Sequence, residues 1–294
     1  MKKKRAIVTG GSSNHIPAMG VLVLNILESC PDFSDDIIIY HDAMISEDDK
    51  RRIRSIYPVI FKEYDTSCFQ REAFNRTVWH HFSFMLFCKY ECWNLLDEYE
   101  QVMWLDYDIY IYIYCSELFD LATPAMFMNS ISTIRKFNDN VFTHLDALSD
   151  VDLVNVPSVS CGTFVLSDTF PSYRQFYQDC LRLTNELSDC LTSAEEAVIS
   201  VLLQRYHVTP TPADSKIYCF NPKRGPVPDT VKIVHIWGQQ KFWNGFRFKP
   251  WERLYQKWQK DYGGRKVRSN GFRYKAVLRD ILPYGIVTRI LKRK

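Results

Sequence analysis

The chain has 294 residues, which is enough for one large domain or two small ones with a full hydrophobic core. Apolar residues make up 46% of the sequence and charged residues 24%, a composition that excludes a disordered or fibrous protein. Residues 251–294 carry a net charge of +10, whereas the remaining residues carry a net charge of −7. An acidic body with a basic tail argues against a nucleic-acid-binding groove and predicts a catalytic body with an electrostatic anchor.

Two further features bear on localisation and redox state. No run approaches the roughly eighteen consecutive apolar residues of a membrane-spanning helix, and the apolar stretch after the basic residues 2–5 is too short for a signal peptide. We therefore expect a cytoplasmic protein. The nine cysteines include no C-x-x-C pair, a pattern that favours buried reduced thiols over a zinc site.

Strands and helices alternate over the first 105 residues. We predict strands at 4–9, 37–40, 59–61 and 101–105, and helices at 18–29, after the capping-box sequence at 46–49, and at 84–96. This alternation predicts an α/β fold with a mostly parallel, Rossmann-like central sheet flanked by helices. The second half is less regular, with strands expected at 158–166 and 231–236 and helices at 171–187 and 195–204.

Asp106 and Asp108 form the most informative motif. They lie two residues apart where a buried strand ends, so their side chains point to the same side, at the edge where parallel sheets bind ligands. Two ionised carboxylates this close repel each other unless a cation lies between them or both reach water. Mg²⁺ or Mn²⁺ meets this requirement, and a solvated turn with incidental acids is the simpler alternative.

A second motif, H-x-x-G-x-x-K-x-W, begins at His235, directly after the apolar residues 231–234. Gly238 lets the backbone approach a phosphate closely, and Lys241 supplies a cation for it. Taken alone, His235 is more typical of a structural histidine. In combination with the aspartate pair, it indicates a third metal ligand next to a phosphate-binding segment.

Together these motifs resemble those of the family 8 glycosyltransferases, the group that contains glycogenin and bacterial lipopolysaccharide glucosyl- and galactosyltransferases. The resemblance covers residues 4–245. It implies a GT-A fold, a nucleotide-sugar donor that is usually UDP-linked, a requirement for Mn²⁺ or Mg²⁺, and retention of the anomeric configuration. We therefore expect a catalytic domain at 1–250, with a nucleotide-sugar half at 1–115 and an acceptor half at 116–250, followed by the basic aromatic tail 251–294.

The resemblance also implies roles for individual residues. Asp106, Asp108 and His235 match the metal ligands of the family, while Phe242 replaces the proline of its H-x-x-G-x-x-K-P-W motif. The positions that the resemblance assigns to the nucleotide sugar are Thr9, Gly10, Ser12, Asn14, His15, Lys89, Asp106, Tyr107, Asp108, Ser160, Cys161, Gly238 and Lys241.

Two segments depart from the family pattern. The family holds uracil with an acid-rich loop that ends in a stacking tyrosine, whereas this loop reads Ser12-Ser13-Asn14-His15. The imidazole is still able to stack on a base, but the acidic contact to uracil is absent. The family's F-N-[AS]-G strand appears here as Val159-Ser160-Cys161-Gly162, without the asparagine that contacts the sugar.

Glu195 and Glu196 take the place of the D-Q pair that faces the anomeric carbon in the family. We predict that these two acids are the catalytic residues, which stabilise positive charge at the anomeric centre, and that Glu196 is a more credible nucleophile than a glutamine. They equally fit simple partners of a helix dipole. A covalent intermediate and same-face attack are both open as routes to retention.

The tail, residues 251–294, predicts binding to an anionic membrane surface. Residues 276–294 are amphipathic and basic-ended, as in segments that lie in the membrane interface, where each cation contributes about 1 kcal/mol. A solvated helix packed on the catalytic domain is the alternative. We expect a hexosyltransferase, peripheral on the inner face of the cell membrane, that moves glucose or galactose from a UDP-sugar to a glycan or glycolipid acceptor of a bacterial surface, such as lipopolysaccharide or capsule.

Two other functions compete with this interpretation. A non-catalytic sugar- or lipid-binding protein derived from a transferase is supported by the altered uracil loop. An NAD(P)-dependent short-chain dehydrogenase is suggested by residues 8–13, Val-Thr-Gly-Gly-Ser-Ser, although the further glycines of a dinucleotide-binding turn are missing.

Overall fold

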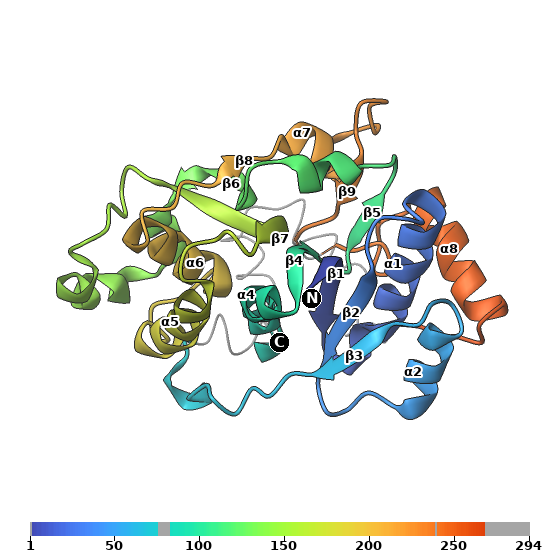
Figure 1. Ribbon diagram of the computed structural model, residues 1–294, viewed down its shortest axis with the longest axis horizontal. Coiled ribbons are helices and arrows are strands. Elements are labelled where there is room, and N and C mark those ends of the chain that lie inside the picture. The colour runs from blue at the N-terminus through green and yellow to red at the C-terminus, as the bar shows by residue number, and fades with distance from the viewer. Residues whose placement is uncertain (1, 76–82, 239, 268–294) are drawn as a thin grey trace, which may run out of the picture.

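The computed structural model describes residues 2–75, 83–238 and 240–267, and a seven-stranded sheet crosses its centre (Figure 1). The order of the strands in this sheet is β3-β2-β1-β4-β7-β6-β8. Their bounds are β1 Lys3–Gly11, β2 Asp36–His41, β3 Ile60–Glu63, β4 Tyr99–Leu105, β6 Ala125–Ser132, β7 Pro157–Ser167 and β8 Thr211–Pro212.

Most strands of the sheet are parallel. β1 pairs in parallel with β2 on one side and with β4 on the other, and β2 pairs in parallel with β3. β7 runs antiparallel to both β4 and β6, and β8 is again parallel to β6. The predicted α/β fold with a mostly parallel central sheet is therefore confirmed, and β7 is the strand that departs from the parallel order.

Both faces of the sheet are covered by helices, which explains the continuous apolar strands (Figure 1). Alternate residues of β1 contribute to two separate cores, with Ala6 and Val8 in one and Ile7 in the other. The first core includes residues of α4 Glu91–Asn94, α5 Tyr173–Glu186 and α6 Ala194–Arg205, and the second includes residues of α1 Ile16–Ser29, α2 Glu47–Arg54 and α8 Lys249–Lys260. The short helix α7 spans Ser215–Tyr218.

The helices lie at the predicted positions, but one predicted α-helix is largely a 3₁₀ helix. Ser46 caps α2 as predicted, because its Oγ accepts a hydrogen bond from the backbone N–H of Asp49 at 3.1 Å. The segment expected as one helix at 84–96 consists of a 3₁₀ helix at Phe84–Tyr90, then α4, then a 3₁₀ helix at Leu95–Asp97. Nearly all of its side chains are buried, so packing on every side shapes this backbone more than helical periodicity does.

A second, two-stranded sheet joins distant parts of the chain. β5 Ile109–Ile111 pairs antiparallel with β9 Ile233–His235, and Ile109 lies opposite His235. The backbone N–H of Ile236 continues this pairing by donating to the carbonyl oxygen of Asp108 at 3.2 Å. This small sheet brings the aspartate motif and the histidine motif to the same place.

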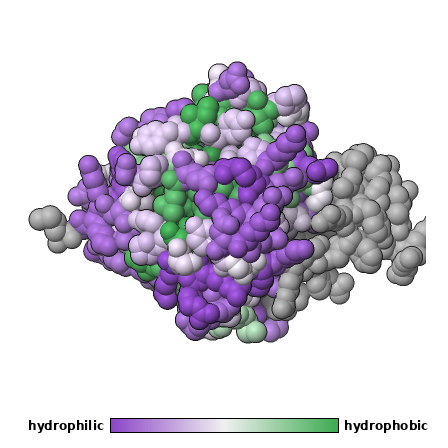
Figure 2. Space-filling view, turned by 90° about the vertical axis from the view of Figure 1, so that its right-hand side faces the viewer, coloured by the Kyte–Doolittle hydropathy of each residue, from purple (hydrophilic) through white to green (hydrophobic). Residues whose placement is uncertain are grey.

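Helix α8 packs on the body of the protein. Trp251, Leu254 and Trp258 are buried on its inner face, while Arg253 and Lys257 pair with Glu28 of α1. The domain boundary predicted at residue 250 thus falls inside a helix that is part of the folded body. The rest of the predicted tail, residues 268–294, lies outside the described residues. The face that carries α2 and α8 is largely hydrophilic (Figure 2).

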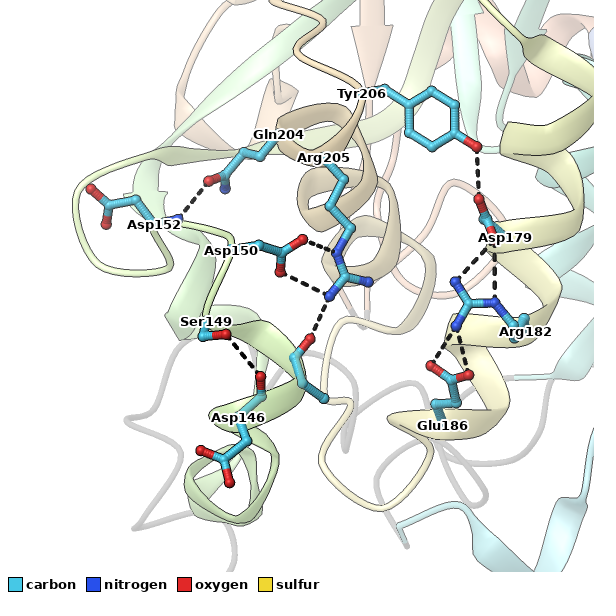
Figure 3. A network of polar contacts seen from close by, with 11 residues as sticks. Asp146, Ser149, Asp150, Asp152, Asp179, Arg182, Glu186, Gln204, Arg205 and Tyr206 are labelled. Atoms are coloured by element: carbon cyan, nitrogen blue, oxygen red, sulfur yellow. Dashed lines mark hydrogen bonds and ion pairs between the residues drawn. The ribbon is translucent and has the colours of Figure 1, made fainter.

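Helix α6 is fastened at its carboxyl end to residues 146–152 and to α5 (Figure 3). Arg205 makes two contacts with the carboxylate of Asp150, at 2.9 and 3.0 Å, and Gln204 accepts a hydrogen bond from the N–H of Asp152 at 2.8 Å. The neighbouring Tyr206 donates to Asp179 of α5 at 2.7 Å. These contacts fix the direction of α6, whose other end lies at the candidate site.

The cysteines are the reduced and mostly buried thiols that the sequence predicts. All nine are free thiols, and only Cys68 is exposed. Within the described residues, none of the helices has both the length and the apolar character needed to span a membrane.

Candidate active site

Asp106, Asp108 and His235 form a cluster that is suited to a divalent cation. Asp106 follows β4, where its N–H continues the ladder to the carbonyl oxygen of Gly162 at 2.9 Å, and His235 is the last residue of β9. One ligand atom of each of the three side chains lies within 4.8 Å of the other two. Two carboxylates and an imidazole are donors that Mn²⁺ and Mg²⁺ accept. The three predicted metal ligands are therefore brought together.

The charges of this cluster are balanced within the protein. His235 Nε2 lies 3.2 Å from Asp108 Oδ1 and 3.8 Å from Asp106 Oδ2, and the Lys241 ammonium pairs with Asp108 Oδ2. Burial alone would raise the pKa of Asp108, but Lys241 and His235 outweigh it and hold this pKa well below its usual range. Burial alone would lower the pKa of His235, but Asp108 and Cys219 together outweigh it and raise this pKa to about 10.

Gly162 and Cys219 hold the imidazole of His235 in place. A Cβ atom at Gly162 would lie 2.3 Å from Cε1 of His235, so only glycine leaves room for the ring. Sγ of Cys219 lies 3.4 Å from Nδ1 of the same ring. A partner on Nδ1 fixes the ring orientation and leaves Nε2 directed at the two aspartates.

An aromatic cluster beside the aspartates joins His15, from the loop after β1, to Tyr107 and Trp243. The ring of His15 stacks on Tyr107 with centroids 4.8 Å apart, and Trp243 lies 5.8 Å from Tyr107. Ser12 Oγ contacts Nδ1 of His15 at 3.0 Å. Burial, followed by the charge of Lys241, lowers the pKa of His15 to about 4, so its imidazole is neutral near pH 7. A flat neutral ring at this position is suited to stacking on a base.

The same loop is tied to the body on both sides of Ser13. Its N–H donates to Asp42 Oδ2 at 3.1 Å, and its carbonyl oxygen accepts a hydrogen bond from the Arg265 guanidinium. Arg265 also pairs with the buried Asp49 of α2, with Nε 3.0 Å from Oδ2. Sequence reasoning missed both Asp42 and Arg265. Asp42 does follow the predicted strand at 37–40, so its place at the carboxyl end of that strand was an available signal.

Lys89 connects the metal-ligand cluster to helix α6. It is buried, and its Nζ lies 2.7 Å from Glu195 Oε1 and 3.1 Å from Asp106 Oδ1. Burial would lower the pKa of Lys89, yet Asp106 and Glu195 outweigh it and raise the pKa well above its ordinary value. Burial raises the pKa of Glu195, which Lys89 opposes.

Glu195 and Glu196 lie in the first turn of α6, as predicted, and each has a lysine partner. Glu196 Oε2 pairs with Lys136, and Glu196 Oε1 accepts the N–H of Cys161 at 3.2 Å. These contacts go beyond a simple interaction with the helix dipole. Lys136 was not among the predicted residues, because no motif surrounds it in the sequence.

The other residues that the resemblance assigns to the nucleotide sugar differ in burial and in contacts. Thr9 is buried, and no partner of its Oγ1 is found within the described residues. Gly10 serves close packing, since a Cβ there would lie 2.6 Å from Sγ of Cys88. Asn14 and Ser160 are partly exposed, and Cys161 is buried. Gly238 has a φ of +92°, which favours glycine.

This fold, with two aspartates after the fourth strand, is that of the GT-A glycosyltransferases. Residues 6–150 match the family model "Glycosyl transferase family 8". No curated protein matches the sequence. The resemblance expected from the motifs is therefore confirmed.

Solved structures share the fold at low sequence identity. The galactosyltransferase LgtC, solved with donor and acceptor sugar analogues, is 14% identical with a TM-score of 0.64, and the match covers 86% of this chain and 95% of that one. The bifunctional glycosyltransferase WbbM is 12% identical with a TM-score of 0.60, over 88% of this chain and 50% of its own. The apo form of GlyE from Streptococcus pneumoniae TIGR4 is 14% identical with a TM-score of 0.55, over 88% and 61%.

The contact between Gly162 and His235 gives a test of the metal site. In G162A the new methyl group displaces the imidazole, so we expect Mn²⁺ alone to bind at least about tenfold more weakly. The measurement is a calorimetric titration of the protein with MnCl₂. The matched control on the same strand is S160A, which we expect to bind Mn²⁺ as the wild type does. Equal affinities for G162A and the wild type would show that His235 is not a ligand.

The low pKa of His15 predicts a pH-dependent stability. Between its ordinary value of 6.5 and its folded value of about 4, the unfolded chain binds a proton that the folded chain does not, so stability falls as the pH decreases through this range. H15F keeps a ring on Tyr107 but has no proton to bind. We expect its loss of unfolding free energy between pH 7 and pH 4.5 to be about 2 kcal/mol smaller than in the wild type. Urea denaturation at both pH values measures this, and identical losses would contradict it.

Proposed function

We propose that the protein is a retaining, metal-dependent glycosyltransferase that moves a hexose, glucose or galactose, from a UDP-sugar to a glycan or glycolipid of a bacterial surface. The observation that carries this proposal is the convergence of Asp106, Asp108 and His235 beside two half-buried glutamates, Glu195 and Glu196. One group of charges is suited to a diphosphate with its cation. The other is suited to the sugar that the diphosphate leaves.

The chemistry requires charge stabilisation at both ends of the bond that breaks. Held by Asp106, Asp108 and His235, a divalent cation would neutralise the departing diphosphate. Lys241 and Lys89 contribute fixed positive charge to the same region, where negative charge develops.

The anomeric carbon becomes cationic as its bond to the diphosphate breaks. Glu195 and Glu196, which come from a single helix turn, supply the negative charge that stabilises it. Retention then follows from a covalent intermediate on Glu196 or from attack on the same face by the acceptor hydroxyl.

The donor's base would lie by the loop after β1. His15 and Tyr107 offer stacked rings, and the contacts of Ser13 with Asp42 and Arg265 hold the loop. A pocket of about 490 Å³ at the carboxyl ends of β2 and β3 shares Asp42 with this region. Stacked rings accept any base, so the choice of a UDP-linked donor rests on the family resemblance and not on this aromatic pair.

The proposal also includes the kinds of donor and acceptor sugar and a location at the membrane. LgtC, which has the same fold, is a galactosyltransferase solved with sugar analogues in both sites, and this supports a hexose donor and a sugar acceptor. Ile131, Phe142, Leu145 and Val154 expose apolar surface on the acceptor half. The net charge of +10 on residues 251–294 supports a place on the inner face of the cell membrane.

Hydrolysis of nucleotide sugars tests the activity. With Mn²⁺, we expect the wild type to hydrolyse at least one UDP-hexose in a panel of nucleotide sugars. D106N and D108N should each lower the rate at least about a hundredfold, because charge stabilisation at the diphosphate is lost. The control is D168N, at the residue directly after the carboxyl end of β7, which removes the ion pair with Lys2.

Two other results would support the competing functions. Sugar binding without hydrolysis of any donor would favour the non-catalytic binding protein. Binding of NAD(P)H, followed by fluorescence, would favour the dehydrogenase, which the GT-A fold does not support.

Membrane association has a separate test. We expect the full chain to sediment with anionic liposomes at low salt and to be released at high salt, because the Debye length falls from about 30 Å at 0.01 M to about 3 Å at 1 M. Neutral liposomes are the control. Failure to sediment with anionic liposomes at low salt would contradict the electrostatic anchor.

A further inference from the structure

We propose that Lys136 is a positioning residue that keeps Glu196 ionised and directed at the sugar of the donor. This inference rests on the proposed function and adds to it a residue that acts through Glu196. Lys136 pairs with the Glu196 carboxylate and supplies its counter-charge. The lysine and the glutamate of this chain would therefore act as one unit.

Each oxygen of the Glu196 carboxylate has one donor, and the two donors come from different elements. Lys136, the last residue of a 3₁₀ helix at Thr133–Lys136, pairs with Oε2. The backbone N–H of Cys161, on β7, donates to Oε1 at 3.2 Å. A carboxylate held at both oxygens has a defined orientation, and the lysine supplies the charge that the backbone group cannot.

Lys136 also holds the chain that leads into α6. Its carbonyl oxygen accepts hydrogen bonds from Thr192 N at 3.0 Å, from Thr192 Oγ1 at 2.7 Å and from Ser193 N at 3.2 Å. One residue thus fixes both the start of α6 and the carboxylate in its first turn. Lys136 itself is 6% exposed, so its side chain has little freedom to take another partner.

Further contacts keep α6 from shifting relative to β7. Ser200 Oγ donates to the carbonyl oxygen of Glu196 at 2.6 Å and accepts the N–H of Val159 at 3.0 Å. At the other end of the helix, Arg205 pairs with Asp150 (Figure 3). Because the helix is held along its length, loss of the Lys136 ammonium changes the charge at Glu196 more than its position.

The charged and titratable groups around Glu196 come from three elements. Lys136 faces it from the 3₁₀ helix, the Cys161 thiol from β7, and Glu195 from α6 itself. Lys89, on the 3₁₀ helix Phe84–Tyr90, is bonded to Glu195 and so balances that second acid. Without Lys136, these two half-buried acids would share one lysine, and a desolvated carboxylate that lacks a counter-charge is destabilised relative to its neutral form.

An ionised Glu196 has a function that a structural ion pair does not need. As the bond from the anomeric carbon to the diphosphate breaks, positive charge grows on that carbon, and a fixed carboxylate stabilises it. A protonated Glu196 loses this effect. Activity should then follow the ionisation of Glu196, which Lys136 controls without touching the sugar.

Four variants test the inference through the pH dependence of Mn²⁺-dependent hydrolysis of UDP-glucose and UDP-galactose. In K136M we expect kcat at pH 7 to fall at least about tenfold with little change in KM, and the acidic limb of the kcat profile to move up by about one pH unit or more. K136R keeps the charge and should retain kcat within about threefold. E196Q should lose activity, and K136M/E196Q should be no worse than E196Q alone.

The control is R205M, which removes the ion pair at the opposite end of the same helix. We expect it to lower stability without moving the pH profile, as a purely structural contact does. Binding of UDP by K136M, measured calorimetrically, shows that its donor site is intact. If K136M does not fold, K136Q and the comparison of E196Q with the double variant provide the same test.

The outcomes separate the two proposals. An active wild type whose pH profile is unchanged in K136M or K136Q, or an E196Q variant with near-normal turnover, would overturn the role of Lys136 and leave the proposed function in place. A wild type that hydrolyses no nucleotide sugar would overturn both.

Discussion

The pairing of β5 with β9 is the contact on which the candidate site depends. It aligns Ile109 with His235 and so joins an aspartate motif near residue 106 to a histidine motif that comes much later in the chain. Neither motif holds a complete set of metal ligands. Because the antiparallel ladder has a fixed spacing, the imidazole can reach the carboxylates only in this register, and a shift by one residue would turn it to the opposite face.

Buried negative charge is the second constraint, and it explains the distribution of lysines. Asp106, Asp108, Glu195 and Glu196 lie in one partly enclosed region, and each is met by a cation: Lys89 for the first and third, Lys241 and His235 for the second, Lys136 for the fourth. An uncompensated carboxylate in such a place would take up a proton. The charges of the site are therefore present as ion pairs. These ion pairs remain available to a nucleotide-sugar donor that brings its diphosphate together with a divalent cation.

The carboxyl-terminal segment supports the site from the other side of the sheet. Helix α8 buries two tryptophans against the body, and Gly264 has no room for a side chain because a Cβ there would lie 2.0 Å from Trp258. This close approach brings Arg265 to Asp49 and to the carbonyl oxygen of Ser13. The first part of the predicted anchor, which includes Arg265, thus supports the loop that precedes α1.

The sequence by itself determined the alternation of strands and helices over the first 105 residues, the apolar strands buried on both faces, and the identity of the three metal-ligand candidates, but it gave no signal for β5, β6 and β8. Local periodicity and spacing carry this information, because neighbours in the chain are neighbours on a strand or a helix. Only the tertiary structure decided that Gly162 makes room for His235, that Cys219 orients its ring, that Lys136 pairs with Glu196, and that α8 is part of the folded body. Each of these depends on which distant segments meet, and isolated glycines, cysteines and lysines leave no periodic signal in the chain.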